Sequence, residues 1–123
     1  MAQILVVDDQ EDIVQLVVKA LELQNHKVTG LTSVLDLDKN SLPRFDLILL
    51  DIMMPRKNGF EVLEEVRKTS KVPILMLTAL HDEETQVRTF ELLVDGFIQK
   101  PFSLVVLHKQ IEAVLKRHYG EMD

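Results

Sequence analysis

The sequence predicts a doubly wound α/β domain built on a parallel sheet. Short apolar runs alternate five times with segments of helical periodicity, which is typical of strands joined by crossover helices. Three runs are continuously apolar, as strands covered by helices on both faces usually are. The 123 residues, 46% of them hydrophobic, suffice for one domain with a sizeable core. The expected strands are Ile4–Val7, Lys27–Thr29, Leu47–Leu50, Pro73–Leu77 and Gly96–Ile98.

Five helices are expected between and after these strands. The first begins near Glu11, with acidic residues in its first turn, where the helix dipole stabilises negative charge. A weaker helical segment covers 34–39, and a third helix begins near Gly59. The fourth begins at 81–84 and has a thin apolar face. The fifth ends in the basic run 116–118, which suits the C-terminus of a helix.

Composition excludes several classes of function. The chain has no cysteine, which rules out disulfide frameworks, zinc–thiolate sites and thiol catalysis. Twenty Asp and Glu against fourteen Lys and Arg give a net charge of −6, so direct contact with nucleic acid is not expected. No apolar run approaches the roughly 20 residues of a membrane helix, and no signal peptide is recognisable. A cytoplasmic domain without membrane contact is therefore expected.

Four predicted strands end in groups of compatible chemistry. Asp8 and Asp9 follow the first strand, and Asp51 follows the third. Thr78 follows the fourth strand and Lys100 follows the fifth. Binding sites of doubly wound sheets lie beyond the carboxyl ends of the strands. We therefore expect three carboxylates, one hydroxyl and one ammonium in a single cleft.

This set of groups predicts a magnesium site that handles phosphate. Carboxylates packed together need a cation, and all-oxygen ligands favour Mg²⁺. An open Mg²⁺ site beside a lysine suits a phosphoryl group, whose oxygens both cations neutralise. A carboxylate in such a site can act as the nucleophile and form an aspartyl phosphate. One polar residue at a strand end is usually structural, so the inference rests on the joint pattern.

The same residues resemble the receiver domains of two-component response regulators. The resemblance covers residues 4 to about 117 and is strongest to receivers of winged-helix transcriptional regulators. It implies a flavodoxin-like five-stranded parallel sheet of order 2-1-3-4-5 with five helices. Residues 1–119 would be the receiver domain, and 120–123 a frayed tail or the start of a linker to an absent output domain. The matching stretches are Ile4–Asp9, Asp46–Pro55 with Gly59, Pro73–Ala79 and Lys100–Phe102.

For the acceptor and the metal, the resemblance implies four residues. Asp51 would accept a phosphoryl group from a phosphohistidine on a sensor histidine kinase. Mg²⁺ would be held by Asp8, Asp9 and Asp51, together with the backbone carbonyl of Met53. The domain would be a signalling switch and not an enzyme, taking part only in its own phosphoryl transfer and autodephosphorylation.

For the switch, the resemblance implies a second group of residues. Thr78 and Lys100 would bind the phosphoryl oxygens, Ala79 would leave room for them, and Phe97 would move with Thr78. The bond preceding Pro101 would be cis, which is uncommon for X–Pro bonds in general. Phosphorylation would rearrange the face formed by the fourth helix, fifth strand and fifth helix. That face would also mediate a receiver homodimer and control a DNA-binding output domain.

A few positions depart from the family pattern. Leu93 stands where a glycine is frequent, which predicts a changed end of the fourth helix. Gln10 replaces a frequent acidic residue and removes one charge near the metal. Gln110 and Val106 replace charged residues that usually form salt bridges between two receivers.

Three other functions compete with this interpretation. A Mg²⁺-dependent phosphatase with Asp51 as nucleophile needs a second carboxylate two residues later, where this chain has Met53. A flavodoxin-like cofactor carrier needs a phosphate-binding loop and stacking aromatics, but the chain has no Trp and one Tyr. A pseudo-receiver that binds partners without phosphorylation would not need the full set of site residues. The phosphatase and the pseudo-receiver are kept as alternatives.

Overall fold

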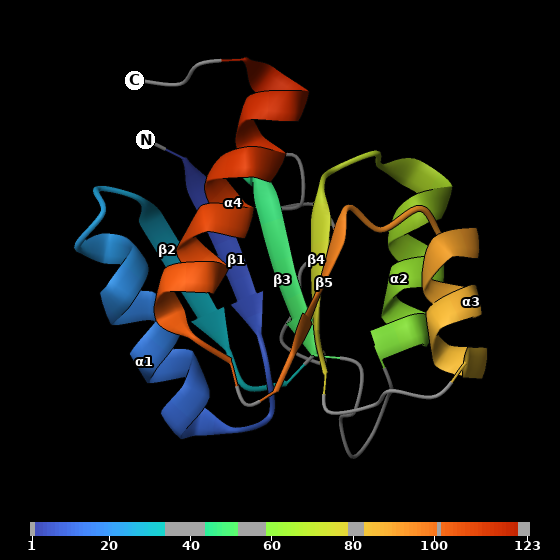
Figure 1. The fold of residues 1–123 in the computed structure, drawn as a ribbon, viewed down its shortest axis with the longest axis horizontal. Helices are drawn as coiled ribbons and strands as arrows, with labels where there is room; N and C mark the ends of the chain where they lie inside the picture. The colour runs from blue at the N-terminus through green and yellow to red at the C-terminus, as the bar shows by residue number, and fades with distance from the viewer. Residues whose placement is uncertain (1, 34–43, 52–58, 79–82, 101, 121–123) are drawn as a thin grey trace.

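The strands of this computed structural model lie in one parallel sheet. The structure describes residues 2–33, 44–51, 59–78, 83–100 and 102–120. In chain order they are β1 (Gln3–Val7), β2 (Lys27–Leu31), β3 (Leu47–Asp51), β4 (Ile74–Thr78) and β5 (Gly96–Gln99). Their order across the sheet is β2-β1-β3-β4-β5, and their arrowheads point to the lower edge of the view in Figure 1. The predicted fold class and strand order are confirmed.

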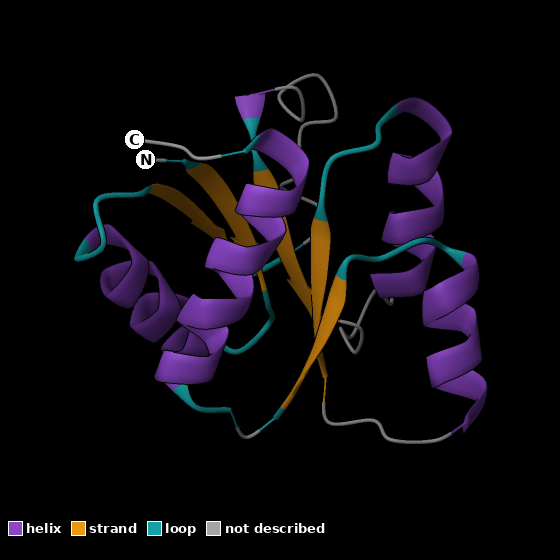
Figure 2. Cartoon of the chain, turned by 45° about the horizontal axis from the view of Figure 1, so that its top comes forward, coloured by secondary structure: helices purple, strands orange, loops and turns teal. Residues whose placement is uncertain are grey.

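Helices flank the sheet on both sides. The described helices are α1 (Glu11–Glu22), α2 (Gly59–Thr69), α3 (Glu83–Glu91) and α4 (Leu104–Tyr119). They correspond to the first, third, fourth and fifth predicted helices, and segment 34–39, where the second is predicted, lies outside the described residues. α1 and α4 lie on one face and α2 and α3 on the other (Figure 1, Figure 2). Within the described part of the chain, none of the helices has the length and apolar character that crossing a bilayer requires.

Alternate residues of the central strands face the two helical layers. Ile4 and Val6 of β1 belong to the apolar cluster formed with α1 and α4, whereas Leu5 and Val7 belong to the cluster formed with α2. β3 is buried along its whole length, which explains why its sequence is continuously apolar. Each large buried side chain contributes about 1.5–3 kcal/mol. This burial fixes the strand register and, with it, the positions of the strand ends.

β2 extends two residues beyond the predicted strand, because the sequence signal stops at a glycine. Gly30 pairs with Val6 of β1. A Cβ atom at this position would lie 2.5 Å from Cγ1 of Val14 on α1. The missing side chain therefore allows α1 to pack closely on the strand. Glycine weakens the strand pattern in the sequence, but the packing of this helix requires it.

The end of α3 keeps a left-handed turn without a glycine. Leu93 has a φ of 57°, a conformation that a residue with a Cβ adopts only at a cost. Arg67 of α2 donates hydrogen bonds from Nε to the Leu92 carbonyl and from Nη2 to the Leu93 carbonyl, each at 3.2 Å. Carbonyls at a helix end lack partners within the helix. The arginine therefore supplies donors to the turn that Leu93 forms.

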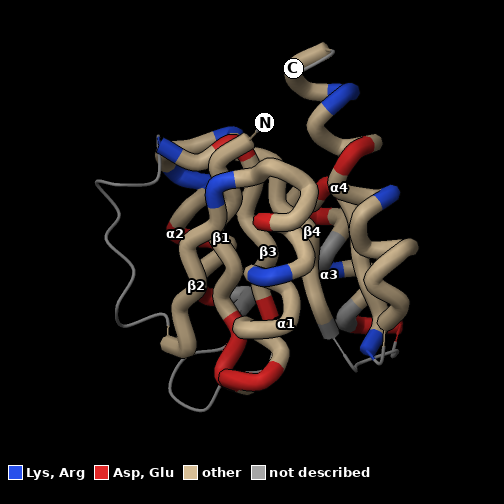
Figure 3. The backbone as a smooth tube through the Cα atoms, turned by 90° about the vertical axis from the view of Figure 1, so that its left-hand side faces the viewer, with Lys and Arg blue, Asp and Glu red and all other residues tan. Residues whose placement is uncertain are grey.

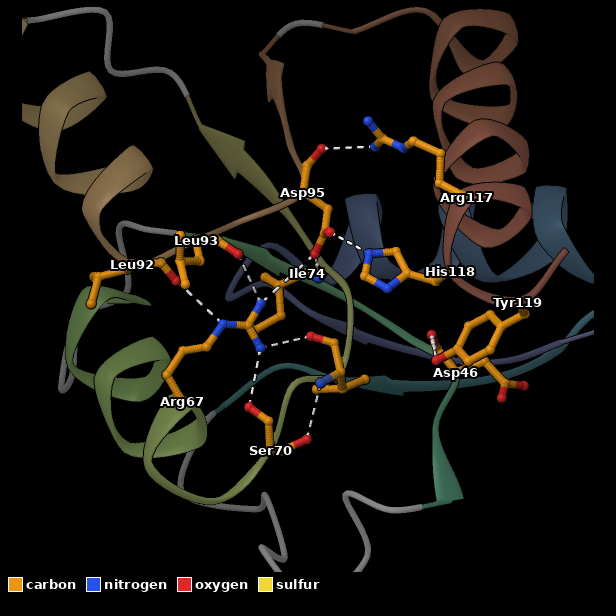
Figure 4. A network of polar contacts seen from close by, with 11 residues as sticks. Asp46, Arg67, Ser70, Ile74, Leu92, Leu93, Asp95, Arg117, His118 and Tyr119 are labelled. Atoms are coloured by element: carbon orange, nitrogen blue, oxygen red, sulfur yellow. Dashed lines mark hydrogen bonds and ion pairs between the residues drawn. The ribbon is translucent and has the colours of Figure 1, made fainter.

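Asp95 connects this arginine to the amino-terminal edge of the sheet (Figure 4). Its Oδ2 accepts a hydrogen bond from the Ile74 N–H at 2.8 Å and lies 3.7 Å from Nη2 of Arg67. Its Oδ1 lies 2.5 Å from Nε2 of His118 on α4. Burial lowers the pKa of the Arg67 guanidinium, and the Asp95 carboxylate opposes that effect. This network holds the starts of β4 and β5 against α2 and α4.

We expect Arg67→Met to lower the free energy of unfolding by about 2–4 kcal/mol, because buried carbonyls and Asp95 lose their donor. The matched control is Arg88→Met. Arg88 pairs with Glu64 at 2.9 Å, but its side chain is 44% exposed against 15% for Arg67. The control should therefore change by less than about 1 kcal/mol. Urea unfolding measures both variants, and equal losses would contradict the role given to Arg67.

Candidate functional site

The carboxyl ends of the strands form the edge of the sheet opposite the two chain termini (Figure 1). β1 continues into Asp8 and Asp9, β3 ends at Asp51, and β5 continues into Lys100. β3 lies on one side of β1 and β2 on the other, so this edge contains the topological switch point of the sheet. Figure 3 shows acidic positions gathered where β1 runs into α1. The fold therefore brings charged residues from three strands to one place.

Three carboxylates lie together at this edge. One oxygen from each of Asp8, Asp9 and Asp51 lies within 4.8 Å of the others. Asp8 is fully buried and Asp51 is 4% exposed, whereas Asp9 is exposed to solvent. Like charges at such distances repel more strongly in a partly dehydrated site than in water. The cluster therefore requires positive charge close by.

Lys100 supplies one such charge. Its Nζ lies 2.7 Å from Oδ2 of Asp8 and 3.6 Å from Oδ2 of Asp51. A third contact joins Nζ to Oε1 of Gln10, which accepts a hydrogen bond at 2.9 Å. The lysine side chain is only 13% exposed. Its ammonium thus bridges the two buried carboxylates and offsets part of their repulsion.

The charge that remains fits a divalent metal ion. With the acids ionised, three carboxylates and one ammonium leave two negative charges. Oδ2 of Asp8 is buried and, within the described residues, has the ion contact with Lys100 but no hydrogen bond of regular geometry. Carboxylate oxygens are the donors that hard cations prefer. The cluster can therefore hold a hard divalent cation, with Asp9 on its solvent side.

Gln10 is a site residue whose contact sequence reasoning missed. The sequence indicates only that a frequent negative charge is absent at this position. The hydrogen bond to Lys100 joins residues that are 90 positions apart, and no local pattern signals it. The single local sign is the residue type, because Gln10 is the N-cap of α1 and glutamine is not among the preferred capping residues.

Comparison with known proteins decides which family has this arrangement. The family described as response regulator receiver domain matches residues 4–112. The chain belongs to this family. This receiver domain is 41% identical over 117 residues to Response regulator RR06 of Streptococcus pneumoniae serotype 2. The match covers 94% of this chain and 54% of that relative. It is 38% identical over 125 residues to Transcriptional regulatory protein CpxR of Escherichia coli K12, and this match covers 98% of this chain and 53% of that relative.

The receiver domain spans about half the length of these curated relatives. Among solved structures it is similar to the chemotaxis protein CheY4 of Vibrio cholerae. The TM-score is 0.85 and the identity 32%, over 93% of this chain and 98% of that one. The structural neighbour supports the fold along its whole length, whereas the two curated relatives extend well beyond the region they share with this chain.

The structure brings together four residues predicted for the site of this receiver domain. These are Asp8, Asp9, Asp51 and Lys100. Thr78 is the last residue of β4, and its side chain lies outside what the structure describes. Met53, Ala79 and Pro101 also lie outside the described residues. The predicted roles of Thr78, Met53, Ala79 and Pro101 therefore stay predictions.

Phe97, the predicted switch aromatic, lies in β5 and is partly buried. It packs against the apolar cluster on the α2 side of the sheet. It also lines a cavity of about 400 Å³ together with Phe90 of α3 and with Val94. The aromatic ring therefore has space beside it into which it could repack.

We expect Lys100→Met to destabilise the metal-free receiver domain by about 3 kcal/mol, because a buried carboxylate loses its counter-charge. A millimolar divalent cation should restore part of that loss, since it can take the place of the ammonium. The matched control is Lys109→Met on α4, whose side chain is 71% exposed. Urea unfolding with a chelator and with the cation measures both effects. Equal stability of wild type and Lys100→Met in the chelator would contradict this account.

Proposed function

We propose that this receiver domain is a phosphorylation-activated switch in which Asp51 accepts a phosphoryl group from a phosphohistidine of a sensor histidine kinase. One observation carries the proposal: Asp51 is buried within a carboxylate cluster whose counter-charge is Lys100. In the transfer, an Asp51 oxygen bonds to phosphorus as the nitrogen–phosphorus bond breaks. The electron pair of that bond stays on the imidazole, which then takes up a proton.

Mg²⁺ is the proposed cofactor. Asp8, Asp9 and Asp51 would hold it, and the resemblance to other receivers adds the carbonyl of Met53. Mg²⁺ suits a site of few carboxylates and several waters. When bound, it would neutralise charge on the phosphoryl oxygens. The proposal is supported by the all-oxygen donors and by the two negative charges that Lys100 leaves.

Lys100 would leave its carboxylate partners and bind a phosphoryl oxygen as a point charge. Thr78 would donate to another phosphoryl oxygen, Ala79 would leave room for the group, and Pro101 would follow a cis bond. These three roles rest on the sequence resemblance. Phe97 would then repack, which the cavity beside it supports. Taking part in its own phosphoryl transfer and autodephosphorylation would be the only chemistry of the domain.

The output surface would be the face formed by α3, β5 and α4. Phe90 is 77% exposed on α3, and Val105 and Val106 are 70% and 50% exposed on α4. We propose that this face forms a receiver homodimer after phosphorylation. Gln110 and Val106 lack charge, so contacts on this face would depend more on apolar area than on salt bridges.

The domain would control a DNA-binding output domain in the cytoplasm. Two observations support this: the name of a relative that is a transcriptional regulatory protein, and the extra length of that relative. In this proposal the receiver occupies 1–119, and 120–123 begin a linker to the output domain or form a frayed tail. The net charge of −6 supports the view that the receiver itself does not contact nucleic acid or a membrane surface.

Intact mass spectrometry tests the acceptor. Incubation with MgCl₂ and acetyl phosphate should add one phosphoryl group to the wild type and none to Asp51→Asn, since the amide cannot form the acyl phosphate. A chelator should also prevent the gain. The matched control Asp12→Asn changes an exposed aspartate on α1 and should be phosphorylated like the wild type.

Two results would contradict the proposal. A wild type that gains no phosphoryl group while still binding Mg²⁺ would favour the pseudo-receiver. A gain in Asp51→Asn equal to that of the wild type would place the acceptor elsewhere in the chain.

A further inference from the structure

Gln10 directs its side chain away from the helix that it begins. As the N-cap residue of α1 it has φ −87° and ψ 104°, and its carbonyl accepts hydrogen bonds from the Ile13 and Val14 N–H groups at 3.1 Å. The side chain of an N-cap residue usually accepts a further hydrogen bond from the first turn. The Gln10 side chain makes no such bond. Its Oε1 accepts instead from Nζ of Lys100 at 2.9 Å.

The backbone of Gln10 is fixed by the same carboxylate that binds the lysine. Oδ1 of Asp8 accepts a hydrogen bond from the Gln10 N–H at 2.9 Å, and Oδ2 of Asp8 lies 2.7 Å from Nζ of Lys100. Asp8, Gln10 and Lys100 thus form a closed triangle of polar contacts between the ends of β1 and β5. Asp8 is fully buried, so its carboxylate holds the backbone of Gln10 in a fixed place. From there the side-chain amide of Gln10 reaches the Lys100 ammonium.

The Gln10 amide differs from the other two acceptors of the ammonium in its charge. Asp8 and Asp51 are carboxylates that a metal ion also attracts. A cation bound to them would weaken their hold on Lys100, whereas a neutral amide attracts the metal less strongly than a carboxylate does. The amide also leaves the cluster at two negative charges, and a glutamate at the same position would raise the number to three.

We propose that Gln10 is a positioning residue for Lys100. It holds the ammonium at the site when the carboxylates turn to a metal ion, and it releases the ammonium to a phosphoryl oxygen without having to break an ion pair. This inference rests on the proposed function of Asp51. It makes the identity of residue 10 a determinant of how fast this receiver domain is phosphorylated.

Two variants separate positioning from helix capping and from charge. Gln10→Ser supplies a preferred N-cap side chain that is too short to reach Lys100. Gln10→Glu keeps an acceptor within reach but adds a negative charge. The matched control is Gln15→Ala, which removes a glutamine of α1 whose side chain bonds to Glu11 at 3.2 Å. Thermal unfolding should show that Gln10→Ser is at least as stable as the wild type.

The first readout is hydrogen exchange of the Lys100 ammonium, followed by NMR with ¹⁵N-labelled lysine and without phosphoryl donor. Gln10→Ser should exchange about fivefold faster than the wild type, the factor for losing a hydrogen bond of about 1 kcal/mol. Gln10→Glu and Gln15→Ala should exchange no faster than the wild type. Lys100→Met identifies the signal, which must vanish in that variant.

The second readout is the rate of phosphorylation by acetyl phosphate at saturating Mg²⁺. Gln10→Ser should react about fivefold more slowly than the wild type, because Lys100 loses one hydrogen bond and is held loosely. Gln10→Glu should also react more slowly, because an ion pair then holds Lys100. Gln15→Ala should react like the wild type. If Gln10 acted only as the N-cap of α1, Gln10→Ser would not slow phosphorylation, because serine is the better N-cap residue.

The two readouts fail independently. Ammonium exchange in Gln10→Ser equal to the wild type would overturn the inference, whatever the phosphorylation rates. Full phosphorylation rates in both Gln10 variants would overturn it as well. If the wild type takes up no phosphoryl group, the proposed function of Asp51 fails, and the ammonium exchange alone then decides whether Gln10 positions Lys100.

Discussion

The repulsion among three carboxylates at the carboxyl edge of the sheet is the constraint around which this domain is organised. Asp8 and Asp51 are buried side by side, which a dehydrated site tolerates only with a counter-charge. Lys100 is that counter-charge, and it comes from the end of β5, the last strand in the chain. Any cation or phosphoryl group that enters the site must redistribute these contacts, and in the proposed function this redistribution couples the edge to phosphorylation.

At the opposite edge of the sheet, a network of hydrogen bonds connects the strand starts to the helices. Arg67 and Asp95 tie the starts of β4 and β5 to α2 and α4 through hydrogen bonds from several elements. β5 is therefore anchored at its amino end, and Lys100 follows directly after its carboxyl end. Phe97 lies between these two ends, next to a cavity. A shift of Lys100 would thus be taken up at Phe97 more easily than at Asp95.

The sequence predicts the sheet well because its signals are local. Continuous apolar runs mark β1, β3 and β4, and the aspartates that follow β1 and end β3 are read directly from the chain. The meeting of Asp8, Asp9, Asp51 and Lys100 is predicted as well, because the carboxyl ends of parallel strands share one edge. Contacts that depend on one particular side chain of another element are not predicted. The sequence does not show that β2 continues past Gly30, because the glycine is required by close packing against Val14 of α1. The hydrogen bond between Gln10 and Lys100 joins residues that are 90 positions apart, and no periodicity or spacing encodes it.

The central claim is that Lys100 and a metal ion share the same carboxylates, and calorimetric titration with Mg²⁺ tests it most directly. Wild type and Lys100→Met would be compared at the same ionic strength, with Lys109→Met as the control. The account predicts that Lys100→Met binds Mg²⁺ about tenfold more tightly than the wild type, because a competing positive charge close to the carboxylates has been removed. Unchanged or weaker Mg²⁺ binding by that variant would contradict the account.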